Sequence, residues 1–92
     1  MSRISARIKV VGMVQGVGYR AYTVEIARSL GLKGWVRNLL DGGVEAVIEG
    51  EEIHVQQAIN ACRTGPARAQ VEHLSIDINN GTDEFSSFDI RY

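Results

Sequence analysis

The sequence has 92 residues, of which 45% are hydrophobic and 23% are charged, a balance typical of a small globular protein. We therefore expect residues 1–92 to form a single domain with one core, and we exclude a disordered chain or a coiled coil. Ten Lys and Arg residues stand against eleven Asp and Glu. The net charge of −1 gives no general attraction to nucleic acid or to an acidic membrane, so any anion binding must be local.

The sequence also lacks the patterns that direct a chain into or through a membrane. Its longest uncharged apolar stretch, residues 10–14, is too short to cross a bilayer, and the N-terminus carries no secretory signal. The single cysteine, Cys62, excludes an internal disulfide. We therefore expect a cytoplasmic protein, with a monomer as the default state.

The first half of the chain predicts a strand followed by a helix. Apolar and polar residues alternate over 4–10, which indicates a half-buried strand. A segment punctuated by glycines follows at 12–18. Over residues 19–30 the apolar residues recur at helical spacing, and Gly31 suits the position just beyond a helix C-terminus.

A hairpin and a second helix are expected next. Residues 33–39 and 44–49 predict two strands, and Leu-Asp-Gly-Gly at 40–43 supplies the residues of a tight turn between them. Glu51 and Glu52 open a helix with acidic residues placed well against the helix dipole. The helix is expected to end at Thr-Gly-Pro, residues 64–66.

The last part of the chain predicts a strand over 69–78, a loop at 79–82 and a short strand at 88–92. The order is therefore β-α-β-β-α-β, with one short strand beyond it. Two helices cannot cover both faces of a sheet of this size, so both are expected on one face of an antiparallel sheet. This is the α+β class, and the arrangement is a ferredoxin-like α/β sandwich. The fold alone specifies no function.

The segment GMVQGVGYR at 12–20 is the most informative part of the chain. Its glycines allow backbone conformations that turn successive N–H groups inward as an anion-binding nest. The helix that follows adds unpaired first-turn N–H groups and the positive end of its dipole. Arg20, at the helix start, could hold two oxygens of a phosphate. The competing interpretation is that the glycines only shape a turn and Arg20 is a solvated residue.

Two known phosphate motifs do not fit this segment. The nucleotide P-loop requires a Lys-Ser or Lys-Thr pair after its glycines, and none follows here. The dinucleotide fingerprint requires a third glycine where the chain has Ala21. ATP, GTP and NAD are therefore not expected, and no cofactor is predicted.

A second candidate residue is Asn38, at the end of the run GWVRN at 34–38. It shares a strand face with Val36, so a polar amide lies in phase with an apolar residue. At a strand end such an amide usually hydrogen-bonds to neighbouring backbone groups. The functional alternative is that Asn38 holds a water molecule or a substrate oxygen.

Together these segments resemble the acylphosphatase family. The run VVGMVQGVGYR at 10–20 is similar to the first signature of that family. The run at 34–38, followed at the expected spacing by Gly42, Val44 and Gly50, is similar to the second. The stretch at 65–71 also fits, so the resemblance spans nearly the whole chain. Tyr19 departs from the family, which usually has Phe or Met there, and its hydroxyl must reach water or a polar partner.

The resemblance implies the hydrolysis of acyl phosphates to a carboxylate and inorganic phosphate, without a metal ion. By similarity, Arg20 and the loop backbone bind the phosphoryl group and Asn38 orients the attacking water. The implied phosphate-binding residues are Gln15, Gly16, Val17, Gly18, Tyr19 and Arg20. Phosphoryl transfer depends mainly on positioning and charge stabilisation, which a nest and an arginine supply. Neither signature offers an evident general base, which leaves a phosphate oxygen of the substrate as a candidate proton acceptor.

The remaining reactive residues are better explained as structure. His54 and His73 have no neighbouring ligands at metal spacing, so no metal site is predicted. Cys62 belongs to the apolar stripe of the second helix and is expected to be buried. Trp35 could stack on a ligand, although strand aromatic residues usually belong to the core.

Two other functions stay open at this point. Ferredoxin-like domains include non-catalytic modules that bind single-stranded RNA or a protein partner. The predicted strands lack the aromatic pair on which RNA bases stack, and no basic excess marks the sheet, so nucleic acid is not the expected partner. Acylphosphatase-like domains also serve within larger proteins of carbamoyl transfer. The end of the sequence at Tyr92 favours a free-standing enzyme that acts on a small acyl phosphate.

Overall fold

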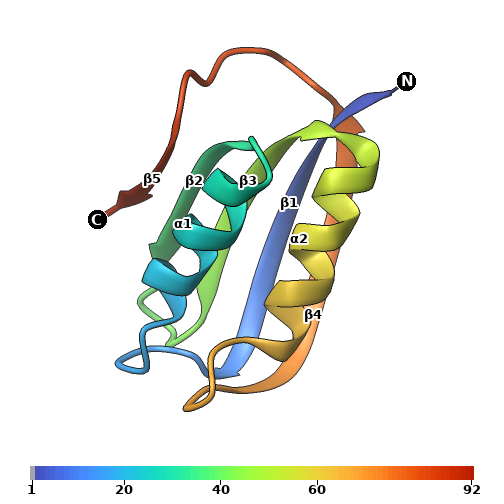
Figure 1. The fold of residues 1–92 in the computed structure, drawn as a ribbon. Helices are drawn as coiled ribbons and strands as arrows, with labels where there is room; N and C mark the ends of the chain where they lie inside the picture. The colour runs from blue at the N-terminus through green and yellow to red at the C-terminus, as the bar shows by residue number, and fades with distance from the viewer. Residues whose placement is uncertain (1) are drawn as a thin grey trace.

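The structure is a computed structural model and describes residues 2–92 (Figure 1). The chain forms five strands and two helices in the predicted order. Their bounds are β1 Arg3–Met13, α1 Tyr19–Ser29, β2 Lys33–Asn38, β3 Val44–Glu51, α2 Glu52–Thr64, β4 Gln70–Asn80 and β5 Phe88–Arg91. The boundaries agree with the sequence prediction to within a few residues. The main difference is at Asn79 and Asn80, where a loop was expected: both residues pair with β1 and extend β4.

The strands form one sheet in the order β4-β1-β3-β2-β5. The neighbours among β4, β1, β3 and β2 run antiparallel, as predicted. The short strand β5 instead pairs in parallel with β2, so the complete sheet is mixed. Figure 1 shows why: residues 81–87 carry the chain from β4, at one edge, across to the far side of β2. The sequence predicts the existence of this strand but not its partner.

Both helices lie on one face of the sheet, as predicted (Figure 1). The main core fills the space between the helices and the sheet. The core strand residues are those that alternate toward the helices. They include Ala6, Ile8 and Val10 of β1 and Val44, Ala46 and Ile48 of β3. From α2 the core receives Val55, Ala58, Ile59 and Cys62, which confirms the burial predicted for the cysteine. On the edge strand β4 only Leu74 is buried, and Ile76 and Ile78 remain partly exposed.

The opposite face of the sheet carries no helix, yet part of it is buried. Trp35 is only 6% exposed, but it lies on this helix-free face and not in the main core. The alternation in β3 predicts that Glu49 faces solvent, whereas its exposure is 2%. The reason is long-range: Glu49 accepts hydrogen bonds from Thr82 and Asp83, in the segment that crosses toward β5.

Two tyrosines of α1 hydrogen-bond to the C-terminal turn of α2, whose last carbonyl groups have no partner within the helix. The Tyr19 hydroxyl donates to the Cys62 carbonyl at 2.6 Å, and the Tyr22 hydroxyl donates to the Ala61 carbonyl at 2.9 Å. Burial, together with the nearby Cys62, raises the pKa of Tyr19 far above its usual value. The hydroxyl that distinguishes this chain from the usual family pattern therefore has a buried partner.

We predict that Tyr19→Phe lowers the free energy of unfolding by about 1–3 kcal/mol, because it leaves the buried Cys62 carbonyl without this donor. A denaturant titration measures the change. The matched variant Tyr22→Phe should cost less, since Tyr22 is only partly buried and the Ala61 carbonyl also accepts from Gly65 N–H at 2.9 Å. An unchanged midpoint for Tyr19→Phe would show that the contact adds nothing to stability.

Candidate functional site

A cavity of about 160 Å³ lies where the glycine-rich loop, the start of α1 and the end of β2 meet. Its lining includes Gly16, Gly18, Arg20 and Asn38, so the two predicted signatures share one cavity. Ile90 of β5 closes another side. A larger hollow of about 710 Å³ lies on the helix-free face, away from these residues. The smaller cavity is the candidate site because the anion-binding features converge on it.

The loop has the backbone geometry that the glycines predict. Gly16 has φ +74° and Gly18 has φ +80°, both in the left-handed region. A Cβ at either position would meet nothing within 4 Å, so glycine is required for the backbone conformation and not for space. The first bond of α1 runs from Tyr22 N–H to the Gly18 carbonyl at 3.0 Å. The N–H groups of the first turn therefore have no acceptor within the helix and remain available to an anion.

Arg20 has no carboxylate partner among the residues that the structure describes. It takes part in none of the ion pairs found among residues 2–92. Its guanidinium carbon lies 5.3 Å from the centroid of the exposed Tyr92 ring, a cation–π contact that leaves the guanidinium N–H groups free for other acceptors. Tyr92 is not among the site residues that the sequence predicts. No local signal could have found it, because only the parallel pairing of β5 brings the last residue of the chain beside α1.

Asn38 carries an unusual polar atom. Its side-chain oxygen, Oδ1, is buried and has no hydrogen-bond partner anywhere in the part of the chain that the structure describes. The neighbouring backbone does not need it, since Leu39 N–H donates to the Gly43 carbonyl at 2.8 Å. A buried acceptor left without a donor costs about 1–3 kcal/mol, so such an atom requires an explanation. The structural role considered for Asn38, bonding to nearby backbone groups, is therefore not what is observed.

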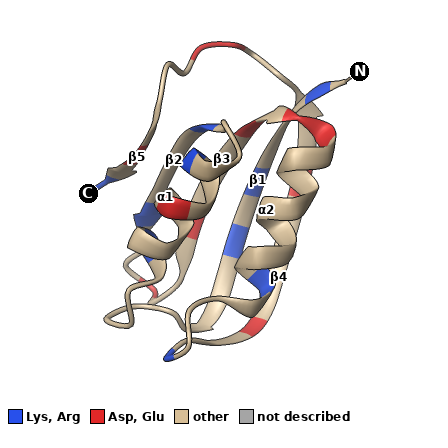
Figure 2. Cartoon of the chain, in the orientation of Figure 1, with Lys and Arg blue, Asp and Glu red and all other residues tan. Residues whose placement is uncertain are grey.

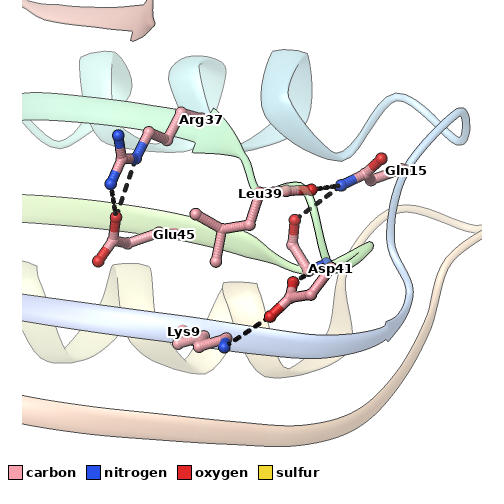
Figure 3. Close-up of polar contacts among 7 residues, drawn as sticks. Lys9, Gln15, Arg37, Leu39, Asp41 and Glu45 are labelled. Carbon is pink, nitrogen blue, oxygen red and sulfur yellow. Dashed lines mark hydrogen bonds and ion pairs between the residues drawn. The ribbon is translucent and has the colours of Figure 1, made fainter. Parts of the chain in front are cut away.

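Gln15 connects the loop to the hairpin that follows Asn38 (Figure 3). Its amide nitrogen donates to the carbonyls of Leu39 and Gly43, at 2.8 and 2.9 Å. The side chain thus holds the hairpin and does not line the cavity; Val17 is likewise absent from the lining. The tip of the same hairpin is held by Asp41, which accepts from Gly43 N–H and from the Lys9 ammonium. The hydrogen bond from Lys9 lowers the pKa of that carboxyl group.

The cavity lining contains no histidine and no carboxylate. Tyr19 borders the cavity, but its hydroxyl is committed to Cys62. Within residues 2–92 no three His, Cys, Asp or Glu side chains gather as a metal site would require. No helix in these residues is long and apolar enough to span a membrane. The chemistry available here is anion binding by N–H groups and a guanidinium, beside one unpartnered amide oxygen.

Comparison with known proteins shows the family of this chain. The sequence model of the family described as Acylphosphatase matches residues 6–90. An acylphosphatase from Aeropyrum pernix is 49% identical over 92 residues, covering 99% of this chain and 91% of that protein. One from Chloroflexus aurantiacus is 46% identical over 90 residues, covering 98% of both. The crystal structure of acylphosphatase from Bacillus subtilis superposes with a TM-score of 0.94 at 35% identity, covering 97% of this chain and 99% of that one. The chain therefore belongs to the acylphosphatase family, whose members hydrolyse acyl phosphates.

Proposed function

We propose that Arg20 and the loop N–H groups hold the phosphoryl group of an acyl phosphate while Asn38 holds the attacking water. The observation that carries this proposal is the buried Asn38 Oδ1, which has no partner among residues 2–92 and belongs to a residue that lines the same cavity as Arg20. An acceptor of this kind suits a water molecule, which can donate one hydrogen to Oδ1 and direct a lone pair at phosphorus. The anion-binding groups and the acceptor then have separate tasks.

The binding half of the site acts through fixed charge. In phosphoryl transfer the negative charge on the phosphoryl oxygens must be stabilised, and little other chemistry is asked of the protein. A guanidinium can donate two parallel hydrogen bonds to two of those oxygens. The first-turn N–H groups of α1 are further donors. The backbone N–H groups of the loop, oriented by the positive φ values of Gly16 and Gly18, add to them, and neither set has to rearrange.

The proposed step is balanced without a protein acid or base. The water oxygen bonds to phosphorus as the bond from phosphorus to the acyl oxygen breaks, and the bonding electrons leave with the carboxylate. A carboxylate is a weak base and departs without protonation. The proton of the water passes to a phosphoryl oxygen, which fits a cavity lined by neither a carboxylate nor a histidine. Inorganic phosphate is the second product.

The size of the cavity bears on the choice of substrate. A volume of about 160 Å³ equals a few water molecules, each of which takes about 30 Å³ in the liquid. A phosphoryl group and a water fill this space, so the acyl group extends outside it. We therefore expect broad tolerance of the acyl group, and strong discrimination at the phosphoryl end.

The proposal is tested by measuring turnover of benzoyl phosphate and of a phosphate monoester, p-nitrophenyl phosphate, in the presence of EDTA. We expect hydrolysis of the acyl phosphate that is insensitive to EDTA, and slow or no hydrolysis of the monoester, whose leaving group is more basic. Inorganic phosphate should inhibit competitively. Loss of activity in EDTA with recovery on adding a divalent ion, or equal rates for the two substrates, would contradict the proposal.

The bond between Gln15 and the hairpin leads to a separate prediction. Gln15→Ala removes two hydrogen bonds from the Leu39 and Gly43 carbonyls and loosens the chain next to Asn38. We expect kcat for benzoyl phosphate to fall about tenfold, because the water is misplaced. The free energy of unfolding should fall by about 1–2 kcal/mol. Kinetics and a denaturant titration on the same sample measure both. Gln56→Ala, an exposed glutamine of α2, is the matched control. Unchanged kcat in Gln15→Ala would remove Gln15 from the account.

A further inference from the structure

The helix-free face of the sheet contains a hollow of about 710 Å³ that the proposed reaction does not use. Trp35 and Val47, each 6% exposed, belong to its lining. Arg7 of β1, Arg91 of β5 and Phe85 of the crossing segment also line it. A space of this volume is in the range of pockets that bind small organic molecules.

The crossing segment 81–87 is fixed at both ends, so one wall of the hollow is already formed. At one end the buried Glu49 carboxylate accepts from the Thr82 hydroxyl at 2.7 Å and from Asp83 N–H at 3.2 Å. At the other end Gly34 N–H donates to the Ser87 carbonyl at 2.9 Å. Because this wall is already ordered, binding a ligand does not carry the entropic cost of ordering it.

Three arginines surround the Trp35 ring. The guanidinium carbons of Arg91, Arg37 and Arg7 lie 4.8, 5.2 and 5.7 Å from its centroid. Figure 2 shows Lys and Arg colouring on β1, on β2 and on β5, the strands that carry these residues. The Glu45 carboxylate engages two of the three: one oxygen accepts from Arg37 and the other from Arg7, at 2.8 Å. Among residues 2–92, Arg91 forms no ion pair and no side-chain hydrogen bond.

The charged side chains that line the hollow are balanced: Arg7 and Arg91 stand against the carboxylates of Glu49 and Glu84. An anion would therefore be held by individual donors and not by a net positive charge. The Glu49 carboxylate is already occupied by donors from the crossing segment. Arg7 is paired with Glu45, whereas Arg91 forms no ion pair among residues 2–92, so its guanidinium N–H groups are the donors that remain for a bound anion. A guanidinium held by stacking keeps its N–H edge for a carboxylate or phosphate.

We infer that this hollow is a second binding site, for a small organic anion with a planar ring. Arg91 holds the anionic group, and the ring packs against Phe85 and Val47. Asn79, which also lines the hollow and pairs with Ser5 of β1, is available to polar groups at the far end of the ring. A nucleoside monophosphate and an aryl carboxylate share this chemistry. The site is separate from the phosphate loop and does not depend on the proposed roles of Arg20 and Asn38.

The chain contains a single tryptophan, so one indole N–H signal in an NMR spectrum reports directly on this hollow. We would titrate the protein with AMP, with benzoate and with inorganic phosphate. We expect AMP or benzoate, and not inorganic phosphate, to shift the Trp35 signal in a saturable way with a dissociation constant of about 1 mM or tighter. The compound that binds, AMP or benzoate, shows whether the anionic group is a phosphate or a carboxylate. Repeating the titration in Arg20→Ala protein excludes an effect transmitted from the phosphate loop.

Two variants separate the halves of the proposed site. Arg91→Gln should weaken binding about tenfold or more by removing the charge, and Phe85→Ala should weaken it by removing the packing surface for the ring. Arg63→Gln, an exposed arginine of α2, is the matched control and should bind as the unaltered protein does. No shift with AMP or benzoate would overturn the inference. A shift that persists in Arg91→Gln, or an equal shift with inorganic phosphate, would also overturn it.

Discussion

Replacing Arg20 with lysine should lower kcat/KM for benzoyl phosphate about 10²–10³-fold, the usual cost of losing one preorganised donor to a developing oxyanion. Lysine keeps the positive charge but has no planar fork for two phosphoryl oxygens. The inhibition constant of inorganic phosphate should rise in the same variant, because the same donors hold the free anion. Both quantities come from steady-state kinetics on the purified protein.

The control for this substitution is Arg63→Lys, which makes the same change on an exposed part of α2. It should leave kcat/KM and the phosphate inhibition constant unchanged. If Arg20→Lys keeps more than about a tenth of the original turnover, the two-oxygen clamp is wrong. The charge alone would then account for binding.

Asn38→Ala should separate chemistry from binding. We expect kcat for benzoyl phosphate to fall about 10²-fold, as for the loss of a group that positions a reactant. The inhibition constant of inorganic phosphate should change little, because the anion donors lie in the loop and in α1. An interaction that matters in the transition state lowers kcat with little effect on ground-state binding.

Stability provides the second readout for Asn38→Ala. Since Asn38 Oδ1 has no partner among the described residues, its removal breaks no hydrogen bond within the protein. The denaturant midpoint should therefore stay the same or rise slightly. A structural amide predicts the opposite, a loss of about 1–3 kcal/mol together with the activity. Asn60→Ala, at an exposed position of α2, is the control. Near-normal turnover in a folded Asn38→Ala protein would remove Asn38 from the site.

Sequence patterns predicted the features that depend on local chemistry. The period-2 alternation over 4–10 and the helical spacing after Tyr19 gave the correct element types, because each pattern reflects one face packed on the core. Gly16 and Gly18 adopt left-handed φ values, as the sequence predicts, because glycine is the residue that adopts them without strain. The loop was therefore predicted from its glycines, whereas strand phase only singled out Asn38 and the family resemblance supplied its role.

Features that depend on distant parts of the chain were not predicted. The parallel pairing of β5 with β2 brings the Tyr92 ring beside the Arg20 guanidinium. Nothing in residues 88–92 specifies β2 as the pairing strand. The clamp from Gln15 to the hairpin joins residues more than twenty positions apart. An amide side chain can bond to almost any backbone carbonyl, so its sequence position carries no information about which one it finds.

The helix-free face shows the same limit. Alternation correctly places Glu49 on the face opposite the core but predicts exposure there and not burial, and Trp35, expected in the core, is buried on that same face. Both side chains are covered because residues 81–87 cross that face and because arginines from three strands gather on the indole. The coverage comes from a segment with no regular pattern, so periodicity has nothing to detect.

The central claim is that the loop N–H groups and Arg20 form the phosphate site and that Asn38 completes it. Titration of ¹⁵N-labelled protein with inorganic phosphate tests this most directly. The account predicts saturable shifts of the backbone N–H signals of residues 16–20 and of the Asn38 side-chain amide. The dissociation constant should equal the kinetic inhibition constant of phosphate. Phosphate that inhibits the enzyme while these signals stay fixed, with the largest shifts elsewhere in the chain, would contradict the account.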